Sequence, residues 1–144
     1  MKVSRIENGI VIDHIKAGCA LTVLKILRIN SHRDVVSMIM NAKSEKYKSK
    51  DIVKIENREL EKEELDKIAL VSPSAKVNKI IKGSVVEKYS VEIPGSVESV
   101  LVCGNPECIT NHENINTKFA VESKEPLKIR CHYCESVMDE VKFR

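Results

Sequence analysis

Four cysteines in two close pairs constrain this sequence more than any other feature. Cys103 and Cys108 have four residues between them, Cys131 and Cys134 have two, and 22 residues separate the pairs. Two short loops of this kind bring four thiolates together around one tetrahedral Zn²⁺ ion. The segment that carries them is short and has few aromatic residues, so metal ligation would supply much of its folding free energy. We therefore predict one structural zinc ion per chain, held by these four cysteines.

Other chemistry is open to the same residues. Cys131-His132-Tyr133-Cys134 could be a redox pair, although a thioredoxin-like site needs a βαβ context and would leave Cys103 and Cys108 unexplained. A catalytic zinc keeps one position open for water, whereas four thiolates close the coordination shell. His112 or His132 could also replace one cysteine as a ligand.

A composition shift divides the chain in two. Residues 1–97 hold 18 basic and 13 acidic residues, a balance of +5, and residues 98–144 hold 6 and 8, a balance of −2. The turn signal Ile93-Pro94-Gly95-Ser96 lies just before this change. We place the boundary near residue 97, which gives a first domain of 1–97 and a second of 98–144.

The first domain is predicted to be rich in sheet. The chain has 16 Ile and 17 Val against 8 Leu, and β-branched residues favour strands. Helices are expected at 18–29, with Cys19 on the apolar face, and from an N-cap at Asn57 to a stop at Ser72-Pro73. Strands are expected at 3–6, 9–15, 35–40, 52–56, 76–81 and 85–91, with Asn8-Gly9 as a turn and an exposed lysine-rich loop after residue 40. The order predicts an α+β fold, an antiparallel sheet with two helices on one face.

Several function classes lack their usual sequence signals. The chain has no glycine-rich phosphate loop and no Gly-x-Ser-x-Gly elbow, so an enzyme acting on small molecules is a distant possibility. A zinc ribbon that binds nucleic acid is the main alternative, but the second domain is net acidic and has only Phe119, Tyr133 and Phe143 for stacking on bases. No apolar stretch is long enough for a secretory leader or a membrane span, which favours a cytoplasmic protein.

Polar residues within apolar strands point to a ligand. Asp13 and His14 interrupt the first long strand, while Lys54 and Asn78 interrupt two others. Strand alternation accounts for each one alone, because one face of such a sheet meets water. Together, a carboxylate, an imidazole, an amide and a lysine could recognise the hydroxyls, base edge and phosphates of a nucleotide.

An ordered set of short motifs resembles a known family, the regulatory chain of aspartate carbamoyltransferase, over nearly the whole chain. The motifs are Val11–Ile15, Asp51–Asn57, Val77–Ile80, Val100–Cys103, Cys108–Ile109 and Cys131–Glu135, in the order of the family. The resemblance implies a non-catalytic chain with an N-terminal ferredoxin-like α/β sandwich, the allosteric domain, followed by a small β-rich, zinc-ribbon-like domain that docks on the catalytic chain.

The resemblance also implies which residues bind ligands. The nucleotide-binding residues would be Asp13, His14, Lys54, Asn78, Ile80, Val85 and Lys88, and the zinc ligands Cys103, Cys108, Cys131 and Cys134. Regulatory chains of this family pair as homodimers that bridge catalytic trimers. CTP in the first domain would shift the trimers of this pyrimidine-synthesis enzyme toward low activity, and ATP in the same pocket would favour the active state.

Overall fold

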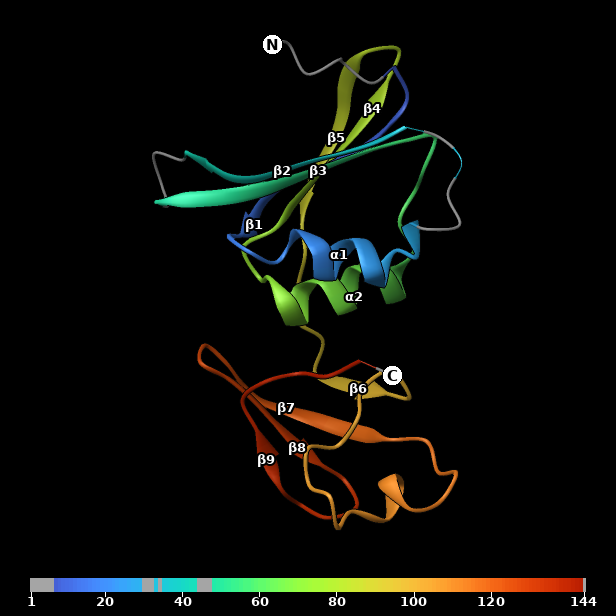
Figure 1. Ribbon diagram of the computed structural model, residues 1–144, viewed down its shortest axis with the longest axis vertical. Coiled ribbons are helices and arrows are strands. Elements are labelled where there is room, and N and C mark those ends of the chain that lie inside the picture. The colour runs from blue at the N-terminus through green and yellow to red at the C-terminus, as the bar shows by residue number, and fades with distance from the viewer. Residues whose placement is uncertain (1–6, 30–32, 34, 44–47, 144) are drawn as a thin grey trace. The chain divides into compact units, whose positions relative to one another are not determined.

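The computed structural model describes residues 7–29, 33, 35–43 and 48–143 (Figure 1). The chain divides into two compact units, residues 1–92 and 93–144. The elements of the first unit are β1 (Gly9–Lys16), α1 (Ala20–Ile26), β2 (Val36–Lys43), β3 (Ser49–Glu56), α2 (Lys62–Val71), β4 (Lys76–Ile81) and β5 (Ser84–Ser90). The strand predicted at 3–6 lies outside the described residues.

The first unit is a sheet with two helices on one face. Its strands lie in the order β2-β3-β1-β4-β5, and every neighbouring pair is antiparallel. The helices α1 and α2 lie side by side below the sheet (Figure 1). A ferredoxin-like sandwich has the chain succession β-α-β-β-α-β, and its four strands lie in the sheet in the order that β1 to β4 have here. β5 adds an edge strand to this arrangement. The predicted α+β class is confirmed.

Strand alternation builds the core of this unit. Ile10 and Ile12 of β1, Val53 of β3 and Val77 of β4 are buried, as is Val23 of α1. Because successive side chains of a strand point to opposite faces, the residues between them lie on the face that the helices leave open. The two helices thus cover one sheet face and leave the other open.

Both helices begin later than predicted. The side chain of Asp51 accepts hydrogen bonds from the backbone N–H groups of Gly18 and Ala20, and α1 starts at Ala20 with Cys19 as its N-cap. Cys19 is therefore a half-buried cap residue and not a core side chain. Arg28, with φ of 53°, follows the end of α1, short of the predicted residue 29.

The N-cap predicted at Asn57 was wrong. Asn57 adopts a left-handed turn with φ of 52° directly after β3, and α2 is capped by Glu61. The Glu64 carboxylate accepts the Glu61 backbone N–H at 3.1 Å, as in a capping box. The predicted stop at Ser72 is confirmed, since Ser72 is the C-cap of α2.

Two further turn and loop predictions were wrong. Gly9 is the first residue of β1 and not part of a turn, and a Cβ atom there would collide with the backbone oxygen of Ile55. The lysine-rich loop was predicted to extend to Lys50, but β2 and β3 continue to Lys43 and Ser49 and place Lys50 within β3. Residues 44–47 of that loop lie outside the described residues.

The second unit is a small four-stranded sheet. Its strands are β6 (Ser96–Glu98), β7 (Lys118–Lys124), β8 (Leu127–Cys131) and β9 (Val137–Met138), paired in that order, with a single 3-10 turn at Ile109–Asn111. The units divide at Glu92/Ile93 and not at residue 97, because Val97 pairs with Phe119 of β7 and both are buried within the second unit.

Candidate metal centre and ligand-binding face

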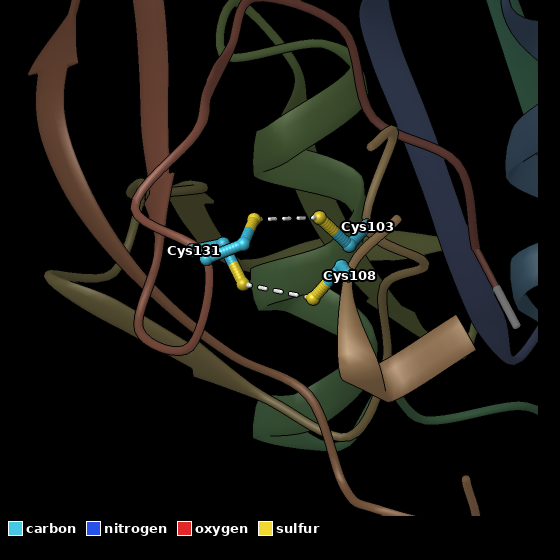
Figure 2. A group of neighbouring side chains, drawn as sticks. Cys103, Cys108 and Cys131 are labelled. Carbon is cyan, nitrogen blue, oxygen red and sulfur yellow. Dashed lines mark hydrogen bonds between the residues drawn. The ribbon is translucent and has the colours of Figure 1, made fainter. Parts of the chain in front are cut away.

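The four cysteines of the second unit converge as the sequence predicted. Their sulfur atoms all lie within 4.8 Å of one another, and Cys103 Sγ is 3.6 Å from Cys134 Sγ. Figure 2 shows Cys103, Cys108 and Cys131, with Cys108 Sγ 3.8 Å from Cys131 Sγ. Three of the side chains are buried and Cys134 is half-buried. The cluster has the donor set and the spacing to hold one metal ion.

Hydrogen bonds fix the first cysteine loop. The side chain of Asn111 donates to the backbone oxygens of Cys103 and Asn105, at 3.0 and 2.7 Å. The backbone N–H of Cys108 donates to Asn105 O at 3.0 Å, which closes the turn. The 3-10 turn that supplies Asn111 therefore holds both cysteines of this pair in place.

The second cysteine loop is a tight turn at the end of β8. The backbone N–H of Glu135 donates to Cys131 O, and the N–H of Cys131 donates to Ser136 O, both at 3.0 Å. Arg130, which forms an ion pair with Glu122 of β7, donates to the backbone oxygen of Glu135 at 2.8 Å. His132 projects from this loop as an exposed side chain, and His112 bonds Pro106 O, so neither imidazole belongs to the sulfur cluster.

The thiols differ in their tendency to ionise. Burial raises the pKa of Cys103 to about 12. At Cys134, burial also raises the pKa, but hydrogen bonds from Ser136 and Asn105 outweigh it and bring the pKa to about 6. A buried thiolate at Cys103 needs a positive charge nearby to be stable. A cation at the centre of the cluster would supply it.

The open sheet face of the first unit gathers the other predicted residues. Val11 of β1 is opposite both Lys54 of β3 and Asn78 of β4, and Asn78 is opposite Lys88 of β5. Side chains of directly opposed residues share a face. This row therefore lies away from the helices, as does the apolar pair formed by Ile80 and Val85, which oppose each other at the next position of the β4–β5 hairpin.

A hollow of about 350 Å³ lies at one end of this face. Its walls include Asp13, His14, Asn78 and Lys88, four of the residues expected from the sequence. Lys54, Ile80 and Val85 lie on the same sheet face but do not line the hollow. Three lining residues were missed, and these are Lys76, Tyr89 and Ser90. Lys76 could have been found by alternation from Asn78, but the position of Ser90 opposite Lys76 depends on the β4–β5 register.

The lysines of this face carry uncompensated charge. Within the part of the chain that the structure describes, Lys54, Lys76 and Lys88 form no ion pair. By contrast, Lys62 and Lys67 of α2 are paired with carboxylates. Free ammonium groups gathered on one face favour an anionic ligand.

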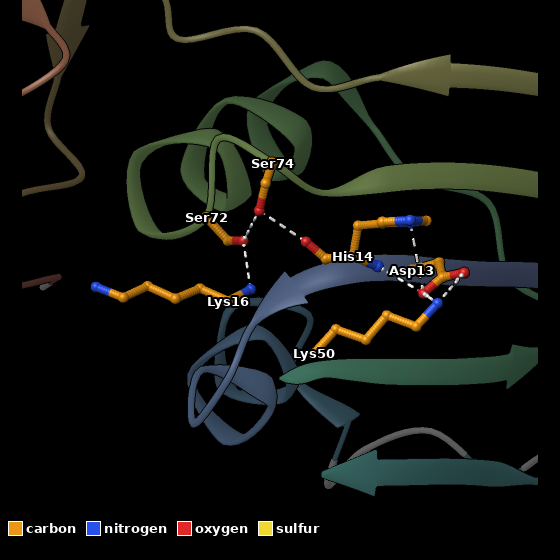
Figure 3. A network of polar contacts seen from close by, with 6 residues as sticks. All are labelled: Asp13, His14, Lys16, Lys50, Ser72 and Ser74. Carbon is orange, nitrogen blue, oxygen red and sulfur yellow. Dashed lines mark hydrogen bonds and ion pairs between the residues drawn. The ribbon is translucent and has the colours of Figure 1, made fainter. Parts of the chain in front are cut away.

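Asp13 forms an ion pair with Lys50, a residue that we predicted to lie in the lysine-rich loop. Lys50 Nζ lies 2.9 Å from one carboxylate oxygen of Asp13 and 3.2 Å from the other (Figure 3). Partial burial raises the pKa of Asp13, but the hydrogen bonds from Lys50 and from the His14 backbone N–H outweigh this and keep the pKa below its usual value. The carboxylate is thus ionised at neutral pH and available as a hydrogen-bond acceptor.

Comparison with known proteins agrees with both halves of this description. Residues 1–92 match the family "aspartate carbamoyltransferase regulatory chain, allosteric domain" and residues 95–144 match the family "aspartate carbamoyltransferase regulatory chain, metal binding domain". The chain is 54% identical over 142 residues to the aspartate carbamoyltransferase regulatory chain of Pyrococcus abyssi, covering 97% of this chain and 93% of that one. It is 52% identical over 143 residues to the chain of the same name from Methanocaldococcus jannaschii, covering 99% and 95%.

The chain belongs to the aspartate carbamoyltransferase regulatory chain family. Membership confirms the resemblance seen in the motifs and makes the chain a regulatory, non-catalytic subunit whose partner is the catalytic chain. Between the two classes weighed from the sequence, it favours regulation over nucleic-acid binding. The match of the second unit to a metal binding domain agrees with the convergence of its four cysteines.

The regulatory chain has no described helix long and apolar enough to cross a membrane.

Proposed function

We propose that the open sheet face of the first unit binds the nucleoside triphosphates CTP and ATP, and that the second unit, built on a structural zinc ion, docks on catalytic chains of aspartate carbamoyltransferase. The protein would thereby adjust the rate of pyrimidine biosynthesis in the cytoplasm. The observation that carries the proposal is the hollow lined by Asp13, His14, Asn78, Lys76 and Lys88. Within the described residues, neither these two lysines nor Lys54 on the same sheet face has a carboxylate partner.

Each part of a nucleotide has a matching group on this face. Lysine ammonium groups are compact charges suited to phosphate oxygens, and Lys54, Lys76 and Lys88 provide them. The ionised Asp13 accepts hydrogen bonds from ribose hydroxyls, and the Asn78 amide both donates to and accepts from a base edge. The Ile80–Val85 pair offers an apolar surface on which a base can lie.

The sulfur geometry supports zinc as the metal. Four thiolates at about 2.3 Å from a tetrahedral Zn²⁺ ion lie about 3.8 Å apart, and two of the sulfur separations in the cluster are 3.6 and 3.8 Å. Four cysteines complete the coordination shell, so the ion would have a structural role and no open position for substrate.

The proposed homodimer would form between first units. β2 is an edge strand of the sheet, and its Met38 and Met40 side chains are 37% and 38% exposed. A sheet edge that no other described strand pairs with, and that has exposed apolar side chains, is suited to pairing with a second copy.

Allosteric control requires that each nucleotide bind the two states of the complex with unequal affinity. We expect CTP to favour the low-activity state and ATP, bound in the same hollow, to favour the active one. A coupling free energy of about 1 to 3 kcal/mol would change the apparent substrate affinity several-fold.

Calorimetric titration of the full chain with CTP and ATP tests the effector site. We expect saturable binding that is lost in the double variant Lys54→Ala, Lys88→Ala. The matched control is Lys62→Ala, Lys67→Ala, which removes the same charge from α2 and should bind both nucleotides as wild type does. With catalytic trimers added, CTP should then inhibit carbamoyl transfer in the control complex but not in the double variant.

Binding lost equally in the control would mean that net charge alone governs the interaction. Failure of wild-type protein to bind either nucleotide would refute the effector site. In that case, affinity for DNA or RNA that falls steeply with salt and survives the Lys54→Ala, Lys88→Ala change would support the nucleic-acid alternative.

A further inference from the structure

The end of β1 leaves the regular strand geometry where it reaches Asp13 and His14. The register with β3 advances from Ile12 opposite Val53 to Ile15 opposite Asp51, so β1 has one extra residue in this stretch. This is a β-bulge, which commonly re-aims a side chain beside a functional site. His14 has φ of 56°, a left-handed conformation that is uncommon for a residue with a side chain.

Two serines from the α2–β4 connection hold the bulged segment. The pairing of β1 with β4 runs from Gly9 to Asp13, and beyond it the Ser74 hydroxyl donates to His14 O at 2.7 Å. The Ser72 hydroxyl accepts the Lys16 backbone N–H at 2.8 Å (Figure 3). Ser72 is fully buried. The serine side chains thus extend the line of hydrogen bonds that the β1–β4 ladder begins.

The same peptide groups orient the Asp13 carboxylate. The backbone N–H of His14 donates to Asp13 Oδ1 at 2.6 Å, while the carbonyl of His14 receives the Ser74 hydroxyl. His14 is therefore bonded through its N–H to Asp13 and through its C=O to Ser74. A rotation of this residue toward ordinary strand geometry would break both bonds and turn Asp13 and His14 away from their present positions.

We propose that Ser74, supported by Ser72, is a positioning residue of the effector site. It does not line the hollow, and it acts by holding the bulge that directs Asp13 and His14 into it. This inference rests on the proposed function, since it assumes that the hollow binds CTP. It predicts that a hydroxyl outside the hollow contributes to nucleotide affinity.

Two substitutions at Ser74 test the role of the hydroxyl. Ser74 is half-buried, so both Ser74→Ala and Ser74→Thr should fold. In calorimetry on the full chain, we expect Ser74→Ala to bind CTP roughly fivefold more weakly than wild type, the equivalent of one lost hydrogen bond. Ser74→Thr keeps the hydroxyl and should restore binding to about the wild-type level. Thr22→Ala, which removes an α1 hydroxyl with no partner among the described residues, should leave CTP affinity unchanged.

The His14 amide resonance separates positioning from a general loss of stability. Its hydrogen bond to Asp13 should give a strongly shifted ¹H–¹⁵N signal in the nucleotide-free chain. We expect this signal to move in Ser74→Ala and to stay in place in Ser74→Thr and Thr22→Ala.

Wild-type CTP affinity in Ser74→Ala would overturn the positioning role and leave the effector site intact. Weaker affinity with an unmoved His14 signal would also overturn it, because the loss would then not pass through the bulge. If the wild-type protein binds no CTP, both the proposed effector site and the positioning role of Ser74 are refuted.

Discussion

The two units of this chain bury different kinds of side chain. The interior of the first is aliphatic, with Ile10, Ile12, Val53 and Val77 among its buried residues. In the second, three of the eight buried apolar side chains in the described residues are cysteines. The first unit can fold by removing apolar surface from water, whereas the second needs something to bring its sulfur atoms together.

This difference matches a division of labour. A core on only one side of the sheet leaves the other face of the first unit free to carry a bulged strand and lysines that have no ion-pair partner among the described residues. The second unit places its cysteine loops at the end of β8 and beside a 3-10 turn, where the four sulfur atoms converge. Under the proposed function, the first unit would add a ligand-binding surface to an aliphatic core, whereas the small second unit would depend on its ion for folding.

Removal of the metal should have the largest effect on stability and should unfold only the second unit. A structural zinc ion contributes on the order of 10 kcal/mol to the folding of a small domain. We expect a chelator, or Cys131→Ser, to abolish the dispersed NMR signals of Phe119 and Ile129 and to abolish association with catalytic chains. The Ile12 and Val77 methyl signals should remain, as should the helical circular dichroism, because α1 and α2 both belong to the first unit.

Cys19→Ser is the matched control, since it removes the one cysteine outside the cluster. It should keep one zinc ion per chain and normal association. A folded wild-type protein with far less than one zinc per chain would contradict this account of the second unit.

Truncation of a buried side chain should have a different consequence in each of the two units. Ile12→Ala removes a fully buried side chain from the first unit and should lower its free energy of unfolding by about 2 to 5 kcal/mol, with metal affinity unchanged. Ile129→Ala removes a fully buried side chain two residues before Cys131 in β8. Because folding and metal binding are linked in this unit, the loss should appear as metal affinity reduced by roughly tenfold or more. Denaturation curves and competition with a zinc chelator measure the two quantities.

Equal loss of metal affinity in Ile12→Ala and Ile129→Ala would show that the units do not fold independently.

Sequence reasoning was most successful where one physical constraint acts alone. Four thiols with short spacings have few ways to satisfy a tetrahedral ion, and the cluster of Cys103, Cys108, Cys131 and Cys134 was predicted from spacing. Strand alternation likewise predicted that the side chains of Asp13 and Asn78 point away from the core. In the structure both lie on the open sheet face.

It failed where the outcome depends on which strands become neighbours. Lys50 lies beside Asp13 because β2 and β3 are longer than their apolar runs, and Ser90 lies beside the hollow through the register of β5. The cap at Glu61 was missed because Asn57 has the better capping side chain but lies in the turn after β3. Such features are fixed by tertiary pairing, which no local pattern contains.

The smallest expected effect concerns pH and the pair formed by Asp13 and Lys50. The folded-state pKa of Asp13 lies below its usual value, so the carboxylate contributes stability that is fully present above the unfolded pKa of about 3.9 and is lost as the pH falls through the folded value. Because the pair is partly exposed, its contribution should not exceed about 1 kcal/mol. Asp13→Asn should therefore be slightly less stable than wild type at pH 7, and the difference should shrink as the pH falls below about 3.9 toward the folded pKa.

This measurement must follow the first unit alone, because acid also protonates the thiolates and releases the metal from the second. The helical signal of α1 and α2 reports on the first unit, and the Lys50→Met variant, alone and combined with Asp13→Asn, gives the coupling of the pair by a double-mutant cycle. A difference between wild type and Asp13→Asn that does not shrink as the pH falls below about 3.9 would mean that Asp13 acts through its shape and its bond to His14 and not through its charge.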